Sequence, residues 1–139
     1  MMVVIAHNNA RSLLSDGPLS EIASLVLFNN IDILCLSETW LKPHHMSSTL
    51  LIPGYKPPIN PDRPARRGGG VAVYLHDGIA FKRLQLVPTD IECLAMEVRL
   101  PRRKSLAVIV CYRPPNGNVD TFLDSWILSS LPFREKRWL

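Results

Sequence analysis

Three polar residues, Asn9, Glu38 and Tyr112, each stand at the C-terminal end of an apolar run that is expected to be a strand. Catalytic groups gather at such ends, because a rigid sheet holds the loops that follow its strands. Glu38 is either a metal ligand or a charge that emerges into solvent. Tyr112 is either functional or an aromatic side chain at the edge of the core. Taken singly, each position leaves both interpretations open.

The elements that must position these residues follow from the apolar pattern. Residues 2–6 are expected to form a buried strand, and residues 31–36 a second one. Between them, Pro18 suits a first helical position, and one helical face carries apolar side chains, namely Leu19, Ile22, Ala23 and Val26. A strand, a helix and a strand in this order predict a βαβ-like opening. Residues 42–67 are rich in proline and predict loops.

Further strands are expected over residues 71–76, 80–87, 93–100 and 106–111. An Asp-Gly pair after His76 is typical of a hairpin between the first two of them. From Asp120 a second helix is expected, with Asp120 as its cap. The sequence therefore predicts an α/β fold, or α+β if the strands are mainly antiparallel.

Composition limits the classes of protein that fit. The 139 residues are 47% hydrophobic and 20% charged, as expected for one globular domain or part of one. No apolar run approaches the roughly 20 residues that cross a bilayer, so we expect no membrane partner. The net charge of +4 is compatible with a nucleic-acid partner but is weak evidence for one.

The three cysteines lie inside separate apolar runs, at positions 35, 93 and 111. Their odd number and wide spacing, without any Cys-x-x-Cys pair, argue against a disulfide framework or a zinc site. We therefore expect buried free thiols and an intracellular protein.

Other candidate sites are weaker. His44 and His45 are adjacent and cannot easily converge on one metal ion. The glycines at 68–70 are followed by an expected strand rather than by Gly-Lys-Ser/Thr and a helix, so a tight strand entry is favoured over a phosphate loop. Two basic clusters are either DNA contacts or solvated loops. They comprise Arg63, Arg66 and Arg67, and Arg102, Arg103 and Lys104.

Five short strings occur in one order along the chain. They are residues 9–13 (Asn-Ala-Arg-Ser-Leu), 37–41 (Ser-Glu-Thr-Trp-Leu), 53–55 (Pro-Gly-Tyr), 67–74 (Arg-Gly-Gly-Gly-Val-Ala-Val-Tyr) and 112–115 (Tyr-Arg-Pro-Pro). This series resembles the endonuclease domain of LINE-type (non-LTR) retrotransposons, in the endonuclease/exonuclease/phosphatase superfamily with the apurinic endonucleases and deoxyribonuclease I. The resemblance covers about residues 3–131. It implies an incomplete two-sheet α/β sandwich of the deoxyribonuclease I type.

The resemblance also implies roles. Glu38 would be the carboxylate ligand of Mg²⁺ (Mn²⁺ being an alternative), with Asn9 beside it on the metal, and Tyr112 would donate to the scissile phosphate. The arginines that would contact DNA are Arg11, Arg66, Arg67 and Arg113. The implied partners are DNA and, in the full-length element, a reverse transcriptase domain, with a nuclear location and no small-molecule cofactor.

The sequence departs from the family in one respect. The family's Asp-x-Asn and Ser-Asp-His motifs, which hold the attacking water and the His–Asp pair, do not occur here; residues 116–120 have similar letters but lie in the turn after Tyr112. We therefore expect residues 1–131 to be the N-terminal part of such a domain, followed by a basic tail at 132–139. An alternative is a truncated, catalytically inactive relic with residual metal or nucleic-acid binding. A phosphoinositide or sphingomyelin phosphodiesterase is disfavoured by the strings at 67–74 and 112–115. Apolar faces left uncovered predict marginal solubility.

Overall fold

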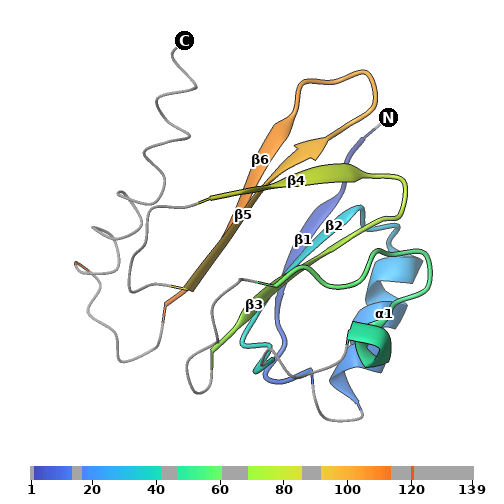
Figure 1. Cartoon of the computed structure of the whole chain (residues 1–139). Coiled ribbons are helices and arrows are strands. Elements are labelled where there is room, and N and C mark those ends of the chain that lie inside the picture. Colours follow the sequence, from blue (N-terminus) through green and yellow to red (C-terminus); the bar gives the residue numbers. More distant parts are fainter. Residues whose placement is uncertain are drawn as a thin grey trace.

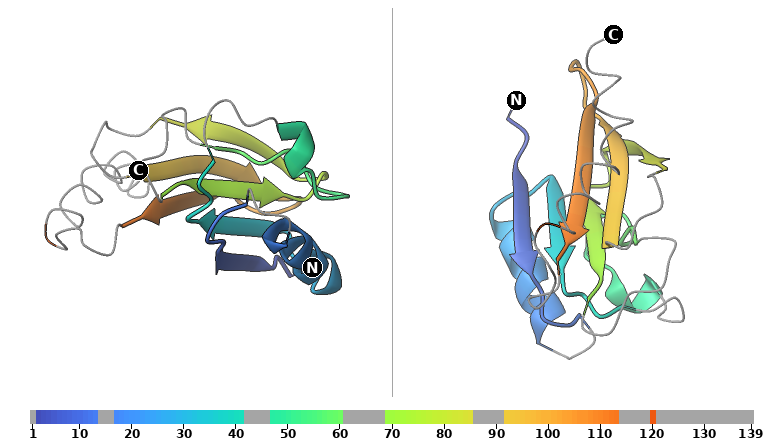
Figure 2. Two further views of the ribbon diagram at one scale, coloured as in Figure 1. Left: turned by 90° about the horizontal axis from the view of Figure 1, so that it is seen from below. Right: turned by 90° about the vertical axis from the view of Figure 1, so that its left-hand side faces the viewer.

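The computed structural model describes residues 2–13, 17–41, 47–60, 69–85, 92–113 and 120. These residues form three layers: one helical layer and two sheets that pack face to face (Figure 1, Figure 2). The helices among the described residues lack the length and apolar character of a membrane span.

The first sheet has the strand order β1-β2-β3, with β1 at Ile5–Asn9, β2 at Ile33–Ser37 and β3 at Val71–Leu75. β1 is parallel to β2, and β3 is antiparallel to it. The second sheet has the order β4-β5-β6 and is antiparallel throughout, with β4 at Ala80–Leu84, β5 at Glu92–Arg99 and β6 at Leu106–Tyr112. The mixed strands confirm the predicted α/β fold class.

Helix α1 (Pro18–Phe28) and the short 3-10 helix η1 (Ser47–Leu50) cover the outer face of the first sheet. Proline begins α1, because its missing N–H needs no partner in the first turn. Asn29 ends the helix, where its backbone and side-chain amides both donate to the carbonyl of Leu25. The apolar face that α1 buries is short, with Ile22 and Val26 pointing toward the sheet.

Two apolar cores follow from this layering. The core between α1 and the first sheet includes Ile22, Val26, Leu34, Leu36, Ile52 and Tyr74. The core between the sheets includes Ile33, Val71, Val73, Met96, Val98 and Val110. β2 and β3 are buried at every position, because one face meets the helix and the other meets the second sheet.

Three sequence expectations are wrong. β1 covers residues 5–9 rather than 2–6. It is also half-exposed rather than buried, because it lies at the edge of its sheet, where polar side chains such as His7 and Asn9 can remain in solvent. The Asp-Gly turn after His76 does not close a hairpin, since β3 and β4 belong to different sheets.

Finally, Cys93 and Cys111 are register partners on β5 and β6 and form a disulfide, with Cα atoms 4.3 Å apart. Only Cys35 is a free, buried thiol as expected. The expected helix after Asp120 and the tail at 132–139 lie outside the described residues.

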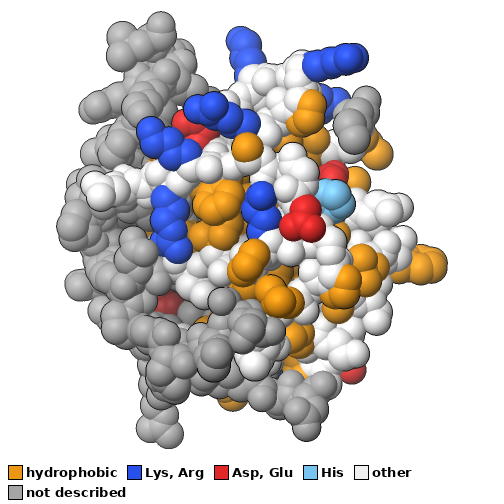
Figure 3. Space-filling view, turned by 45° about the vertical axis from the view of Figure 1, so that its right-hand side comes forward, with side chains coloured by type: hydrophobic (Ala, Val, Ile, Leu, Met, Phe, Trp, Pro, Cys, Tyr) orange, Lys and Arg blue, Asp and Glu red, His pale blue; other side chains and the backbone are white. Residues whose placement is uncertain are grey.

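Large apolar side chains remain exposed on the described surface, scattered among basic ones (Figure 3). They include Ile5 on the edge strand β1, Phe81 on β4, and Leu25, Leu27 and Phe28 on α1. Exposed apolar side chains beside an open strand edge favour association between molecules. Marginal solubility of the chain stays a prediction.

Candidate active site

Glu38 directly follows β2, at the end of the first sheet where β1 also ends. Its backbone carbonyl accepts a hydrogen bond of 2.8 Å from the amide of Ser12, in the connection between β1 and α1. The residues on either side make the same kind of link: Ala10 donates to Ser37 at 2.9 Å and Leu13 to Thr39 at 3.0 Å. The parallel pairing of β1 and β2 therefore continues past both strands and fixes the backbone of Glu38.

Tyr112 ends β6 of the second sheet and meets Glu38 across the gap between the sheets. Its hydroxyl donates a hydrogen bond of 3.2 Å to Oε1 of Glu38. Burial raises the pKa of Tyr112, and the hydrogen bond and charge of Glu38, then the charge of Glu92, raise it further. The phenol is therefore a neutral donor at physiological pH. Both sheets thus contribute to one site.

The backbone around Glu38 is strained. Four non-glycine residues at this end of the sheet have positive φ: Arg11 (47°), Ser12 (91°), Glu38 (53°) and Trp40 (57°). Bulky L residues adopt this conformation at a cost of about 1–3 kcal/mol each, and such residues concentrate at functional sites. Here the continued pairing of the two connections supplies the contacts that hold the strained conformation.

Three of the other predicted residues, Asn9, Arg11 and Arg113, lie on β1, on the connection after it and directly after β6. Asn9 is the last residue of β1 and the register partner of Ser37; its Oδ1 accepts from the amide of Arg11 at 3.2 Å. Arg11 is exposed in the same connection, and Arg113 is exposed beside Tyr112. Arg66 and Arg67 lie outside the described residues.

Sequence reasoning missed Glu92, the first residue of β5. It is the register partner of Tyr112, and its Oε2 accepts a hydrogen bond of 2.5 Å from the amide of Gly70. A signal for it was present: an antiparallel pair that turns at residues 101–104 pairs position 92 with position 112.

One side chain of this site, Glu38, is suited to bind a hard divalent cation. Glu38 is a half-buried carboxylate beside a polar edge, and carboxylate oxygens are what Mg²⁺ prefers while it keeps several waters. The described residues hold no group of three or more His, Cys, Asp or Glu side chains that could bind a metal ion by themselves. Among the described residues, Glu38 could therefore contribute one carboxylate to such a site but not a complete set of ligands.

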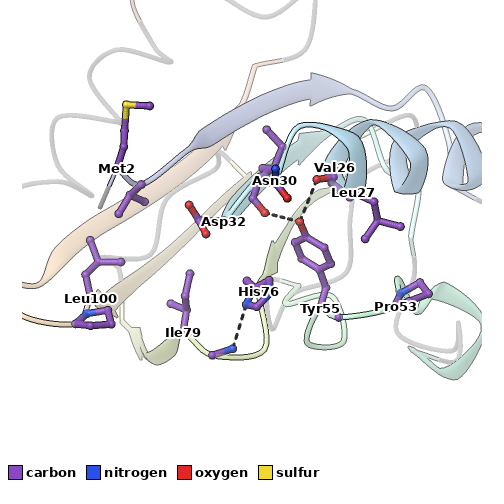
Figure 4. A pocket seen from close by; sticks show the side chains of 15 residues that line it. Met2, Val26, Leu27, Asn30, Asp32, Pro53, Tyr55, His76, Ile79 and Leu100 are labelled. Atoms are coloured by element: carbon purple, nitrogen blue, oxygen red, sulfur yellow. Dashed lines mark hydrogen bonds between the residues drawn. The ribbon is translucent and has the colours of Figure 1, made fainter.

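A cavity of about 500 Å³ lies at the opposite end of the sheets (Figure 4). Its lining is mostly apolar and includes residues that precede β2 or follow β3 and β5, such as Asp32, His76 and Leu100. Tyr55 points into it and donates to the carbonyls of Ile31 and Val26, the latter at 3.3 Å. None of the residues of the Glu38 site lines this cavity, so its volume says nothing about the chemistry of that site.

A model of the Endonuclease/Exonuclease/phosphatase family matches residues 5–138, nearly the whole chain. The chain belongs to this family. Family membership supports a nuclease-like or phosphodiesterase-like function, and enzymes of this family generally use divalent metal ions. A search of curated proteins found no match.

Two solved structures show the family fold. The catalytic domain of human Nocturnin, with a bound sulfate anion, is similar with a TM-score of 0.60 and 16% identity, over 85% of this chain and 50% of that chain. The AP endonuclease LMAP from Leishmania major is similar with a TM-score of 0.58 and 20% identity, over 94% of this chain and 46% of that one. The chain thus spans about half the length of each. The two-sheet sandwich of the deoxyribonuclease I type is confirmed as the fold.

Proposed function

We propose that this chain carries the metal-binding half of a Mg²⁺-dependent DNA endonuclease domain of the LINE retrotransposon type. The observation that supports it best is the hydrogen bond between Tyr112 and Glu38, which joins the two sheets at the ends of β6 and β2. Family membership supports phosphodiester hydrolysis in general. The strings at 67–74 and 112–115 favour the retroelement type.

In this proposal Glu38 holds Mg²⁺, with Mn²⁺ as a substitute and Asn9 orienting the carboxylate or a bound water. When bound, the ion stabilises the charge that develops on the phosphodiester as water attacks phosphorus. Tyr112, whose one O–H donates to Glu38 in the structure, would turn this hydrogen bond to the scissile phosphate, and its raised pKa keeps the hydroxyl protonated. Arg11 and Arg113, both exposed, contact flanking phosphates, as do Arg66 and Arg67.

The biological setting is likewise a proposal. The DNA nick would leave a 3′-hydroxyl for a reverse transcriptase domain of the same element, in the nucleus. No small molecule other than the metal ion is required for this chemistry.

A second candidate is a chain that binds metal or nucleic acid without catalysis. It is favoured by one observation: the 139 residues contain neither the Asp-x-Asn nor the Ser-Asp-His motif. Positioned acid–base groups supply about 10²–10⁴-fold in rate. We therefore expect nicking by this chain to be slower than that of a complete site by about this factor.

The test is nicking of supercoiled plasmid by the 139-residue chain with Mg²⁺. We expect slow nicking that EDTA stops and that Glu38→Ala abolishes. Glu21→Ala is the matched control, because Glu21 is an exposed carboxylate on α1, the helix on the outer face of the first sheet. Nicking that survives Glu38→Ala contradicts the proposal. A folded chain that does not nick, yet binds Mn²⁺ only when Glu38 is present, supports the second candidate instead.

A further inference from the structure

Glu92 extends from the second sheet to the strand entry of the first. It begins β5, and its half-buried carboxylate accepts the 2.5 Å hydrogen bond from the amide of Gly70, one residue before β3. A carboxylate that accepts from a backbone N–H forms a charge-assisted hydrogen bond, roughly twice as strong as a neutral one. This contact links β5 to the segment that precedes β3, although β5 and β3 belong to different sheets.

Gly69 leaves the space that this carboxylate occupies. A Cβ atom built on Gly69 would lie 2.5 Å from Oε1 and 2.9 Å from Oε2 of Glu92. Since Oε2 is held by the amide of Gly70, a side chain at position 69 would push the carboxylate off that amide. Gly70 needs glycine for another reason, because its φ is 105°. The glycines before β3 therefore have a physical role that is not phosphate binding.

The same two glycines hold the backbone beyond Glu38. The carbonyl of Gly69 accepts from the amide of Trp40 at 2.9 Å, and that of Gly70 accepts from Thr39 at 3.3 Å. Both donors directly follow Glu38, and Trp40 has a strained φ of 57°. The segment after Glu38 is thus held on one side by the β1–α1 connection and on the other by residues 69–70.

These contacts close a ring. From Glu92 the ring passes through residues 69–70 to the backbone after Glu38, then through the Glu38 carboxylate to Tyr112, whose register partner is Glu92. We propose that Glu92 is a positioning residue, whose carboxylate holds residues 69–70 against the backbone that follows Glu38. This role rests on the proposed function, since it concerns how Glu38 and Tyr112 are held for their chemistry.

The experiment measures amide hydrogen exchange in the full 139-residue chain at Thr39, Trp40 and Gly70, alongside plasmid nicking with Mg²⁺. The variants are Glu92→Ala, Glu92→Gln, Gly69→Ala and the double variant Gly69→Ala/Glu92→Ala. Glu97→Ala is the matched control, because Glu97 is a half-buried carboxylate on the same strand whose register partners are Lys82 and Ala107.

We expect Glu92→Ala to speed exchange at the three amides by about tenfold, as loss of one charge-assisted hydrogen bond predicts. Glu92→Gln keeps an oxygen acceptor for Gly70 but loses the charge, so exchange should speed by only about threefold and nicking should stay near wild type. Gly69→Ala should resemble Glu92→Ala, and the double variant should be no worse than either, because both changes break one contact. Glu97→Ala should leave the three amides unchanged.

Two results would overturn the inference. One is Gly69→Ala leaving exchange at these amides unchanged, or adding its effect to that of Glu92→Ala. The other is Glu92→Gln abolishing nicking while the amides stay protected, which would make Glu92 a metal ligand. Failure of the proposed function looks different: the wild-type chain does not nick, but the amides still respond to the variants as expected.

Discussion

At one end of the sandwich, Glu38 and Trp40 follow β2 with positive φ, and polar contacts join both sheets. At the other end, Tyr55 and His76 surround a mostly apolar cavity, with their rings edge to face at a centroid distance of 5.7 Å. Positive φ is found there at Asn30, a residue type that adopts this conformation readily, and at Arg102, which follows the cavity residue Pro101 in the turn between β5 and β6. Of the six described non-glycine residues with positive φ, four lie at the Glu38 end.

This difference teaches how to choose a site in this fold. The cavity volume of about 500 Å³ is within the range of ligand pockets. The Tyr55 hydroxyl in its lining, however, is already hydrogen-bonded to the carbonyl of Ile31. The Glu38 end combines strained backbone with a carboxylate–phenol pair that spans the sheets. Strained backbone beside such a pair supports the Glu38 end as the candidate site, whereas strain alone does not, since Arg102 has positive φ too.

The largest effect that sharpens the comparison is expected from Tyr112→Phe. Removing the hydroxyl deletes one donor from the Glu38 end, and loss of one such donor costs about 10²–10³-fold in rate. Because Tyr112 is only half-buried, we expect the free energy of unfolding to change by less than about 0.5 kcal/mol. Plasmid nicking and urea unfolding measure the two quantities. A loss of stability without loss of nicking would mean that Tyr112 has a structural role, as Tyr55 does at the cavity end.

A second prediction concerns Cys35, which lies in β2 between the two ends. Burial raises the pKa of Cys35 from 9.0 to about 11, whereas the unfolded chain ionises this thiol near pH 9. The stability is therefore fully present below pH 9 and falls as pH rises toward 11, by about 2–3 kcal/mol in total. Urea unfolding at a series of pH values measures this, and Cys35→Ala should flatten the curve between pH 9 and 10. An unchanged slope would mean that groups other than Cys35 control alkaline stability, such as Tyr74, whose pKa burial raises to about 12.

At the cavity end, Tyr55→Phe should affect stability alone. The buried hydroxyl donates to the carbonyls of Ile31 and Val26, and its loss leaves buried acceptors with fewer partners, at a cost of about 1–2 kcal/mol. Because the Glu38 site shares no residue with this cavity, nicking of the folded variant should equal that of wild type. A nicking defect at full folding would show that the cavity end acts on the site.

Much of this fold was predictable from local sequence pattern. The helix at Pro18–Phe28 and the strands at Val71–Leu75 and Leu106–Tyr112 have an apolar period or β-branched run that only one element satisfies. The positions of Glu38 and Tyr112 at strand ends followed in the same way. Their mutual contact did not, because it depends on how one sheet packs against the other.

Pairing between distant residues escaped the sequence for a common reason. The Cys93–Cys111 disulfide and the Glu92–Tyr112 pair depend on the register of β5 against β6. The turn at residues 101–104 indicates this register only approximately, and a shift by one residue would change every pair. The hairpin expected at Asp77 and Gly78 had the right turn chemistry, but core packing sends β4 into the other sheet. The residue types at 77 and 78 determine the turn, whereas burial of apolar side chains determines which strand β4 pairs with.

The smallest effect compares strained backbone at the two ends directly. Arg11→Gly relieves a φ of 47°, worth about 1–2 kcal/mol, but glycine adds unfolded-chain entropy worth about 0.5–1 kcal/mol, so we expect a net gain near 0.5 kcal/mol. Asn30→Gly relieves a φ of 51° in a residue that tolerates it, so its gain should be close to zero. Urea unfolding measures both. If Arg11 also contacts DNA phosphate, Arg11→Gly weakens DNA binding and reduces its salt dependence, while Asn30→Gly changes neither. Equal gains in stability at the two positions would mean that the backbone of the Glu38 end is no more strained than that of the cavity end.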